Sequence, residues 1–352
     1  MGKKIMFFTP SLNIGGIERV FITYSNSLCA NYTVYYVYSH KSGGLSSLLN
    51  RDVNQCSLGD IRLRNSLGAL VGIIKKYSPE ILITGGEIPN SFCLLAVFLS
   101  GLKTKVIISH HNYFNIEQNK LLSKLLMKFL YNRAHAVISV SDGITDFLVH
   151  NGVCRNKILT VYNPIDQEQI LLKSNEYIPN EIKGEYVISV GRLSAVKNLT
   201  LMIDAFSLIS KGKNLKLLIV GDGELYNDLC EYIENKKLST KVILLGAMSN
   251  PFPLMKYAKL ILSSSLSEAL PTVFLESFAL GKTVVATPTM GAIDLLRDGK
   301  LGYISDSLTG VDDFAKKINQ AYDNPLEPSV LLGEAQKFSI ENKVKELERI
   351  LD

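Results

Sequence analysis

Short apolar runs alternate with amphipathic stretches along the whole chain. The runs are continuous rather than alternating in polarity, which is typical of parallel strands buried on both faces. The stretches between them, such as GIERVFITYSNSL, KNLTLMIDAFSLISK and DLCEYIENKKL, have helical spacing. Alternating strands and helices predict βαβ units and therefore doubly wound parallel sheets. The predicted strands of the first half are KKIMFFTP, YTVYYVYS, EILITGG, KVIISHH and AVISVSD, and those of the second half are EYVISVGR, LKLLIVGDG, KVILLGA, KLILSSS and TVVATP.

This alternation of strands and helices occurs in both halves of the chain, which predicts an α/β protein of two Rossmann-like domains. Pro164 and the polar run after it separate the halves, so we expect domains over residues 1–165 and 166–334. A chain of 352 residues is also longer than one core usually holds. The end, about 335–352, has helical spacing, and we expect it to pack back on the first domain. Ligands of such folds bind in a cleft at the carboxyl ends of the strands, so residues after each strand are the candidates.

Composition excludes several classes of protein. Hydrophobic residues make up 47% and charged residues 20% of the chain, which is ordinary for a globular protein. The longest apolar run, FCLLAVFLSGL, is shorter than the roughly 20 residues that a membrane span needs. The N-terminus reads as a first strand rather than a signal peptide. Five scattered cysteines without C-x-x-C indicate neither a metal site nor a disulfide framework, and favour a cytosolic protein.

The charge is unevenly spread. Residues 1–165 carry 17 Lys and Arg against 8 Asp and Glu, whereas the remaining residues carry 21 against 25. Residues 119–133 add a predicted helix with Leu121, Leu122, Leu125, Leu126, Phe129 and Leu130 on one face and Lys120, Lys124 and Lys128 on another. An ordinary surface helix explains this pattern as well as contact with an anionic membrane surface does.

Two segments of the first half follow predicted strands. Gly15 and Gly16 precede a helix, where a backbone without side chains can approach an anion, although a plain turn fits equally. The spacing is not G-x-G-x-x-G, which disfavours a dinucleotide site. His110 and His111 end another strand, and because consecutive strand side chains point to opposite faces, only one is expected to face a ligand.

In the second half, Gly191 ends a strand and Arg192 and Lys197 flank the loop that opens the next helix. Two cations at a helix N-terminus oppose the helix dipole, so they favour an anion such as a pyrophosphate, with a solvated loop as the alternative. Gly221 and Gly223 make a tight turn after another strand, which is by itself as typical of a plain turn as of a ligand contact.

The stretch SEALPTVFLESFALGKT carries two carboxylates, Glu268 and Glu276. Its Gly-Lys-Thr resembles a phosphate loop, but Glu276 stands where that motif needs glycine, and the strand follows the motif instead of preceding it. We therefore interpret Gly281 as the end of a helix that begins near Pro271. Glu268 then lies in the loop before the helix and Glu276 in its second turn.

Together these motifs resemble glycosyltransferase family 4, a retaining group with the GT-B fold. The resemblance covers nearly the whole chain. It includes NIGGIER, the strand-end histidine, NPID, SVGRL followed by KN, the GDG turn, Gly246, the E-x7-E pair and GAIDLLRDGKLGYI, in which Asp294 replaces a commoner glutamate. The resemblance implies an acceptor-binding first domain and a nucleotide-sugar-binding second domain.

The resemblance also implies roles for the candidates. Arg192 and Lys197 would bind the donor diphosphate. Glu276 would accept hydrogen bonds from the ribose hydroxyls, and Glu268 would hold the donor sugar. One of the two histidines, with His111 favoured over His110, would contact the sugar or its phosphate. Gly15 and Gly16 approach the diphosphate, and backbone around Ala247 and Met248 reads the base. The remaining candidates for donor binding lie at strand ends, in the turns after them and at the helix start, and are His110, Gly191, Gly221, Leu270, Pro271, Thr272 and Val273.

The absence of D-x-D from the sequence leads us to expect no metal and no other cofactor, with cations and a helix dipole stabilising the leaving diphosphate. The expected donor is a UDP-sugar of a hexose or N-acetylhexosamine. The expected acceptor is an undecaprenyl-diphosphate-linked glycan of O-antigen or other surface-polysaccharide assembly, on the inner face of the cell membrane, with no nucleic-acid partner. A GT-B sugar-nucleotide epimerase and a non-catalytic sugar-nucleotide sensor are the alternatives, and an NAD-dependent oxidoreductase is disfavoured.

Overall fold

The fold is that of a computed structural model, which describes residues 2–12, 15–40, 44–60, 62–111, 120–176 and 184–351, with 120–124 and 126 described by their backbone. The chain divides into two compact units. The first comprises the residues up to Pro164 together with those from Ile340, and the second is Ile165–Ser339. The second unit's two ends lie side by side, since Ile165 forms a parallel bridge with Ser339.

The first unit is built on a parallel sheet, which has seven strands within the described residues, in the order β3-β2-β1-β4-β5-β6-β7. The order reverses between β1 and β4, which makes this the switch point of the sheet. Its strands are β1 (Lys4–Ser11), β2 (Thr33–His40), β3 (Asn54–Ser57), β4 (Ile81–Gly85), β5 (Lys105–His110), β6 (Ala136–Ser139) and β7 (Ile158–Thr160).

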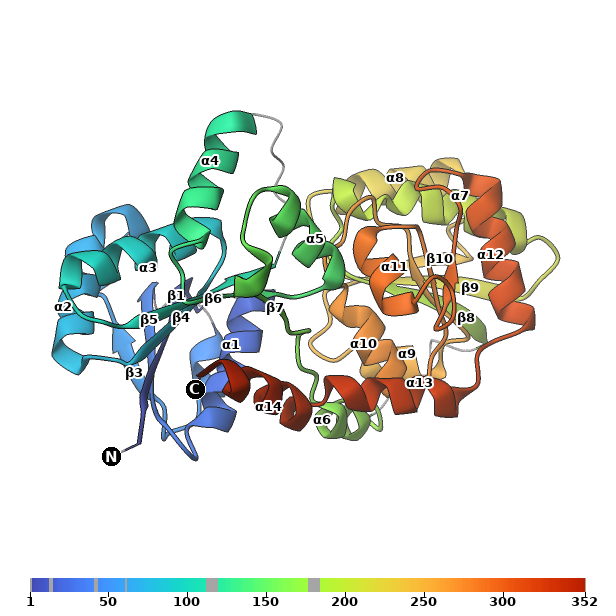
Figure 1. The fold of residues 1–352 in the computed structure, drawn as a ribbon. Helices are drawn as coiled ribbons and strands as arrows, with labels where there is room; N and C mark the ends of the chain where they lie inside the picture. The colour runs from blue at the N-terminus through green and yellow to red at the C-terminus, as the bar shows by residue number, and fades with distance from the viewer. Residues whose placement is uncertain are drawn as a thin grey trace. The chain divides into compact units, whose positions relative to one another are not determined.

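All but the last of the helices of the first unit follow strands of its sheet in the sequence, as Figure 1 shows. Helix α14, although last in sequence, packs on α1, and its Leu347, Ile350 and Leu351 enter the core around Phe7 and Tyr36. These helices are α1 (Gly16–Leu28), α2 (Leu67–Tyr77), α3 (Glu87–Ser100), α4 (Lys120–Tyr131), α5 (Asp142–His150) and α14 (Ile340–Leu351), with short 3-10 turns at Gly44–Leu48, Leu63–Asn65 and Arg155–Lys157.

The second unit has a parallel sheet of six described strands in the order β10-β9-β8-β11-β12-β13, with its switch point between β8 and β11. The strands are β8 (Glu185–Val190), β9 (Leu215–Val220), β10 (Val242–Gly246), β11 (Ile261–Ser263), β12 (Val284–Ala286) and β13 (Tyr303–Ile304). The helices are α6 (Gln167–Lys173), α7 (Leu199–Ile209), α8 (Tyr226–Asn235), α9 (Phe252–Tyr257), α10 (Thr272–Ala279), α11 (Met290–Leu296), α12 (Val311–Asp323) and α13 (Pro328–Ala335), with 3-10 turns at Ala195–Lys197 and Gln336–Phe338.

Local sequence explains several helix starts. The side chains of Ser141, Asp166 and Thr289 each precede a helix and accept a hydrogen bond from a backbone N–H of its first turn. Pro271 immediately precedes α10, which starts at Thr272 with no side-chain cap among the described residues. The first N–H groups of α10 are therefore not satisfied by a cap.

Helix α4 exposes part of its predicted apolar face. Met127 and Tyr131 are buried, Leu130 is half-buried, and Leu125 and Phe129 are each 55% exposed. The side chains of Lys120, Leu121, Leu122, Lys124 and Leu126 lie outside the described residues. Among the described residues, no helix is both long and apolar enough to cross a membrane.

Candidate active site

The candidate site of the second unit lies where β8 and β11 end, at the switch point of the sheet. A small pocket at this edge is lined by residues from the loops after both strands and from α10. Four of its lining residues were predicted from the sequence, namely Gly191, Arg192, Lys197 and Val273, and Ser264 and Ser265 join them.

The centre of this site is an ion pair between Lys197 and Glu268. Their side chains are 25% and 18% exposed, and the Lys197 ammonium donates a hydrogen bond to Glu268 Oε1. The hydroxyl of Ser265 donates to the same carboxylate oxygen at 2.8 Å. The carboxylate is thus held by two donors, and the ammonium keeps further N–H groups for an anion.

The loop that carries Glu268 is held on both sides. On one side, the Ser264 hydroxyl donates to the Lys197 carbonyl at 2.8 Å and the Leu266 N–H to the Val196 carbonyl at 2.8 Å. On the other, the Gly291 N–H donates to the Glu268 carbonyl at 2.9 Å. A Cβ on Gly291 would come within 2.8 Å of the Ala269 backbone, so this contact requires glycine.

Arg192 completes the positive side of the site. Its side chain is exposed and forms no hydrogen bond or ion pair with any residue that the structure describes. Gly221, which follows β9, packs directly on the strand end that leads to Arg192. A Cβ on Gly221 would lie 1.8 Å from the Gly191 carbonyl oxygen. The two loops can therefore approach each other only because position 221 has no side chain.

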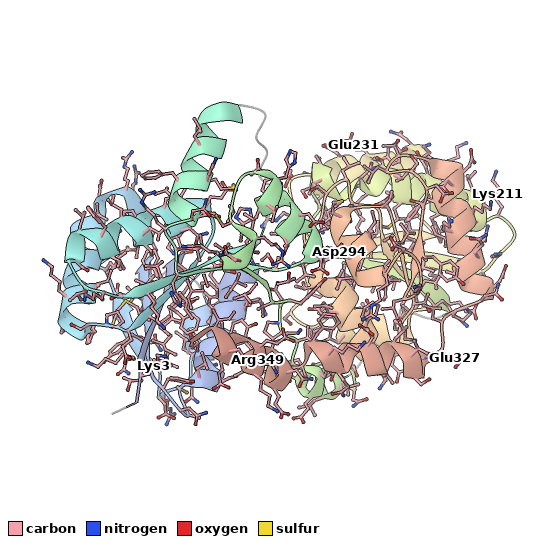
Figure 2. The ribbon with its side chains drawn as sticks, viewed as in Figure 1. Lys3, Lys211, Glu231, Asp294, Glu327 and Arg349 are labelled. Atoms are coloured by element: carbon pink, nitrogen blue, oxygen red, sulfur yellow. The ribbon has the colours of Figure 1, made fainter. Side chains whose placement is uncertain are left out.

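The remaining predicted donor residues lie along the same carboxyl edge. Leu270 and Pro271 are buried before α10, Thr272 is exposed and Val273 half-buried at its first turn, and Glu276 is half-buried in its second turn. Ala247 and Met248 follow β10, with Ala247 exposed. Asp294 lies on α11, where Figure 2 labels it.

In the first unit, His111 follows β5 and is half-buried. Its Nε2 lies 2.7 Å from the Ser109 hydroxyl, and its ring packs against the edge of Phe21 with centroids 6.3 Å apart. Burial, with a smaller contribution from His110, lowers the pKa of His111 to about 3. The imidazole is therefore neutral at physiological pH, suited to a hydrogen bond and not to charge pairing.

His110 does not face a ligand. Its side chain is 1% exposed, its Nδ1 lies 3.1 Å from the Tyr131 hydroxyl, and it stacks on Phe147. The expectation that only one of the two histidines is accessible agrees with this arrangement. Inclusion of His110 among the donor-binding residues is corrected, because α4 and α5 cover it.

Gly15 precedes α1 and Gly16 is its first residue. The carboxylate of Glu18 folds back over this N-terminus, so a Cβ on Gly15 would lie 2.1 Å from Glu18 Oε2. Burial raises the pKa of Glu18, and its own backbone N–H opposes that shift. An anionic ligand at this N-terminus would have to displace the Glu18 carboxylate. Contact of Gly15 and Gly16 with a diphosphate stays a prediction.

Sequence reasoning did not identify Ser109, Ser265, Gly291 or Glu18 as contributors. Serines are common after strands, and only the contact with a predicted residue distinguishes Ser109 and Ser265. Within the described part of the chain, no cluster of His, Cys, Asp and Glu could hold a metal ion.

Comparison with known families assigns both halves of the chain. The model of glycosyltransferase family 4 matches residues 14–169, and that of glycosyl transferases group 1 matches residues 174–339. The chain belongs to glycosyltransferase family 4. The resemblance predicted from its motifs is thereby confirmed, and the protein is a glycosyltransferase.

Two similar proteins come from Campylobacter jejuni. One is N-acetylgalactosamine-N,N'-diacetylbacillosaminyl-diphospho-undecaprenol 4-alpha-N-acetylgalactosaminyltransferase, 28% identical over 86% of this chain and 86% of the relative. The other is GalNAc-alpha-(1->4)-GalNAc-alpha-(1->3)-diNAcBac-PP-undecaprenol alpha-1,4-N-acetyl-D-galactosaminyltransferase, 29% identical over 90% and 88%.

Solved structures share the fold. A glycosyltransferase from Rickettsia africae has a TM-score of 0.84 at 21% identity and covers 100% of this chain and 99% of its own. HepE from Anabaena, solved with UDP, has a TM-score of 0.80 at 18% identity and covers 100% and 99%. The two parallel-sheet units are therefore those of the GT-B fold, as the sequence predicted.

Proposed function

We propose that this protein transfers an N-acetylhexosamine or a hexose from a UDP-sugar to an undecaprenyl-diphosphate-linked glycan, with retention of the anomeric configuration. The observation that carries the donor side is the Lys197–Glu268 pair beside the uncapped start of α10. The acceptor side is supported by the two Campylobacter jejuni relatives, both named for undecaprenol-linked glycans and similar over most of their length. We propose accordingly that the protein acts in assembly of O-antigen or a related surface polysaccharide at the membrane's inner face.

In this proposal the diphosphate binds between Arg192, Lys197 and the first N–H groups of α10. Lys197, held by Glu268, and the backbone N–H groups of α10 are in place before the reaction, so they stabilise the charge that develops on the leaving diphosphate without reorganising. Arg192 adds a positive charge beside them. Lys197 also positions Glu268, whose carboxylate is left to accept hydrogen bonds from the donor sugar. Glu276 accepts from the ribose, and Ala247 and Met248 contact the base. We expect no metal to be required.

The proposed transfer step requires no nucleophile from the protein. The acceptor hydroxyl oxygen bonds to the anomeric carbon as the bond from that carbon to the diphosphate oxygen breaks on the same face. The proton of the acceptor hydroxyl passes to the leaving diphosphate oxygen. Neutral His111, oriented by Ser109, donates or accepts one hydrogen bond to the sugar.

The test is a panel of UDP- and GDP-sugars incubated with undecaprenyl-diphosphate-linked glycans, with released nucleotide and glycolipid product measured together. We expect release of UDP that depends on the acceptor and an α-linked product from an α-linked donor. Release from GDP-sugars only, or a β-linked product, would contradict the proposal. Interconversion of donor sugars without an acceptor would indicate an epimerase. Normal donor binding by Glu268→Gln without turnover by the unaltered protein would indicate a sensor.

A further inference from the structure

A groove of about 810 Å³ opens on the first unit between α3 and α4. Its floor is formed where β5 and β6 begin, with lining residues that include Lys105, Val106 and His135. His111 lies beyond the other end of β5, and the six residues of that strand separate the two edges by about 17 Å. The groove is therefore distinct from the carboxyl edge that carries His111.

The walls of the groove are apolar and open to solvent. Leu94, Leu95, Val97 and Phe98 come from α3, and Phe129 and Leu130 from α4. Phe98 is 80% exposed, Phe129 55% and Leu95 46%. Leu99 and Leu125, on the same two helices, are 50% and 55% exposed. Apolar side chains gathered in this way are typical of a surface that binds a partner.

The rim of the groove is basic. Lys103, Arg133 and Lys157 line it, Lys105 adds a positive charge at the floor, and the described lining includes no Asp or Glu. Lys157 donates to the backbone carbonyls of Asn132 and Ala134 at 2.6 and 2.8 Å, and Arg133 lies over the Phe129 ring at 3.3 Å. Neither contact neutralises a positive charge.

The positive field extends beyond the rim. Burial lowers the pKa of His135, and Lys105, Lys157 and Lys3 lower it further. Three lysines are thus close enough to act on one imidazole. Lys3, which Figure 2 labels, precedes β1 at the same edge of the sheet. An occupant of this groove must offer an apolar chain to its walls and a negative charge to its rim.

We propose that this groove docks the protein on the membrane by taking an anionic phospholipid, with an acyl chain between α3 and α4 and the phosphate at Lys103, Arg133 and Lys157. Charge complementarity and the acyl-compatible walls together favour a phospholipid over an acidic protein, which would leave Phe98 and Phe129 in water. The inference goes beyond the proposed function, since this lipid is neither the donor nor the acceptor.

The chain has no tryptophan, so Phe98→Trp gives a single fluorophore in the groove. The matched control is Tyr257→Trp on α9 of the second unit, where the native side chain is 62% exposed. With vesicles of phosphatidylglycerol and phosphatidylcholine in about 0.1 M salt, we expect the indole emission of the Phe98→Trp protein to shift to the blue and to be quenched by brominated acyl chains. The Tyr257→Trp protein should show neither change. Equal responses of the two variants, or none from Phe98→Trp, would overturn the proposal.

Two double variants test the apolar walls and the basic rim of the groove separately. Phe98→Ser/Phe129→Ser and Lys103→Glu/Arg133→Glu should each lower partition onto these vesicles by about tenfold or more, because each removes two side chains that contact the lipid in this proposal. Their controls are Leu172→Ser/Val330→Ser and Lys211→Glu/Lys300→Glu, exposed pairs on the second unit. Lys211 is labelled in Figure 2.

All variants should keep the thermal unfolding midpoint and the UDP affinity of the unaltered protein, which separates loss of docking from loss of fold or donor site. If the protein partitioned onto phosphatidylcholine vesicles as strongly as onto vesicles that contain phosphatidylglycerol, the proposed binding of the lipid phosphate by basic residues would be overturned. Binding only when the vesicles contain undecaprenyl-diphosphate-linked glycan would assign the groove to the acceptor and overturn the phospholipid. Because no donor sugar is present, failure here leaves the proposed transfer reaction unaffected.

Discussion

At the scale of single residues, Lys197 pairs with Glu268 and, in the proposed function, also binds the diphosphate, so its loss should affect two contacts. We expect Lys197→Ala and Arg192→Ala each to lower kcat/KM by about 30- to 1,000-fold, which corresponds to roughly 2–4 kcal/mol. Lys197→Ala/Glu268→Gln should lose less than the sum of the two single losses, because the two side chains are partners. Steady-state kinetics with Lys211→Ala as the surface control measure this. Near-normal rates for both single variants would refute the diphosphate site.

A second residue-scale prediction concerns acid stability. The folded protein holds the pKa of His111 at about 3, whereas an unfolded histidine titrates near 6.5. Below pH 6.5 the unfolded state therefore binds a proton that the folded state does not, so the free energy of unfolding falls as the pH falls. His111→Gln should remove roughly 2 kcal/mol of the loss between pH 7 and 5, measured by urea unfolding. Identical acid profiles for His111→Gln and the unaltered protein would contradict the assignment.

A site residue could be predicted where the signal was a charged residue that follows a buried strand. Arg192, Lys197 and Glu268 were chosen on that ground, and the structure brings them to one edge. His110 was not correctly predicted, since the strand period separates the two histidines onto opposite faces but does not show which face α4 and α5 cover. Ser265 could not be predicted, because nothing in its sequence neighbourhood separates a carboxylate partner from an ordinary strand-end serine.

At the scale of elements, the turn after β9 sets the spacing of the site. Gly221→Ala should destabilise the second unit by about 3 kcal/mol or more, because the new Cβ would meet the Gly191 carbonyl and neither backbone segment can move freely. Gly212→Ala is the matched control, with a positive φ of 74° and open space around it, so only the backbone strain of about 1 kcal/mol applies. Chemical denaturation compares the two. Equal losses would show that the close approach is not needed.

Strands that lie in a continuous apolar run were predictable, and the three strands outside such a run were not. All ten predicted runs contain a strand, and the expected helix GIERVFITYSNSL coincides with α1. The strands β3, β7 and β13 have four, three and two residues. Each of these strands lies at an edge of its sheet. Its pairing therefore depends on contacts with the neighbouring strand rather than on its own sequence.

At the scale of the whole molecule, the uneven charge of the sequence fits the two proposed binding functions. The basic first half contains the groove proposed for the lipid, and the more acidic second half contains the proposed donor site with its few cations. We therefore predict two separate footprints in amide hydrogen exchange. UDP should slow exchange in residues 191–198, 221–225 and 264–274, since ligand contact reduces local opening of those loops.

Anionic vesicles should instead slow exchange in residues 94–106 and 127–135, the segments that line the groove, and leave the UDP footprint unchanged. Phosphatidylcholine vesicles are the control for charge, and Lys103→Glu/Arg133→Glu is the control for the groove. If UDP alone protected 94–106, or if anionic vesicles protected 264–274, the two functions would share one site and the division of charge between the halves would need another explanation. Retention of both footprints when UDP and vesicles are present together would show that the protein binds its donor while docked.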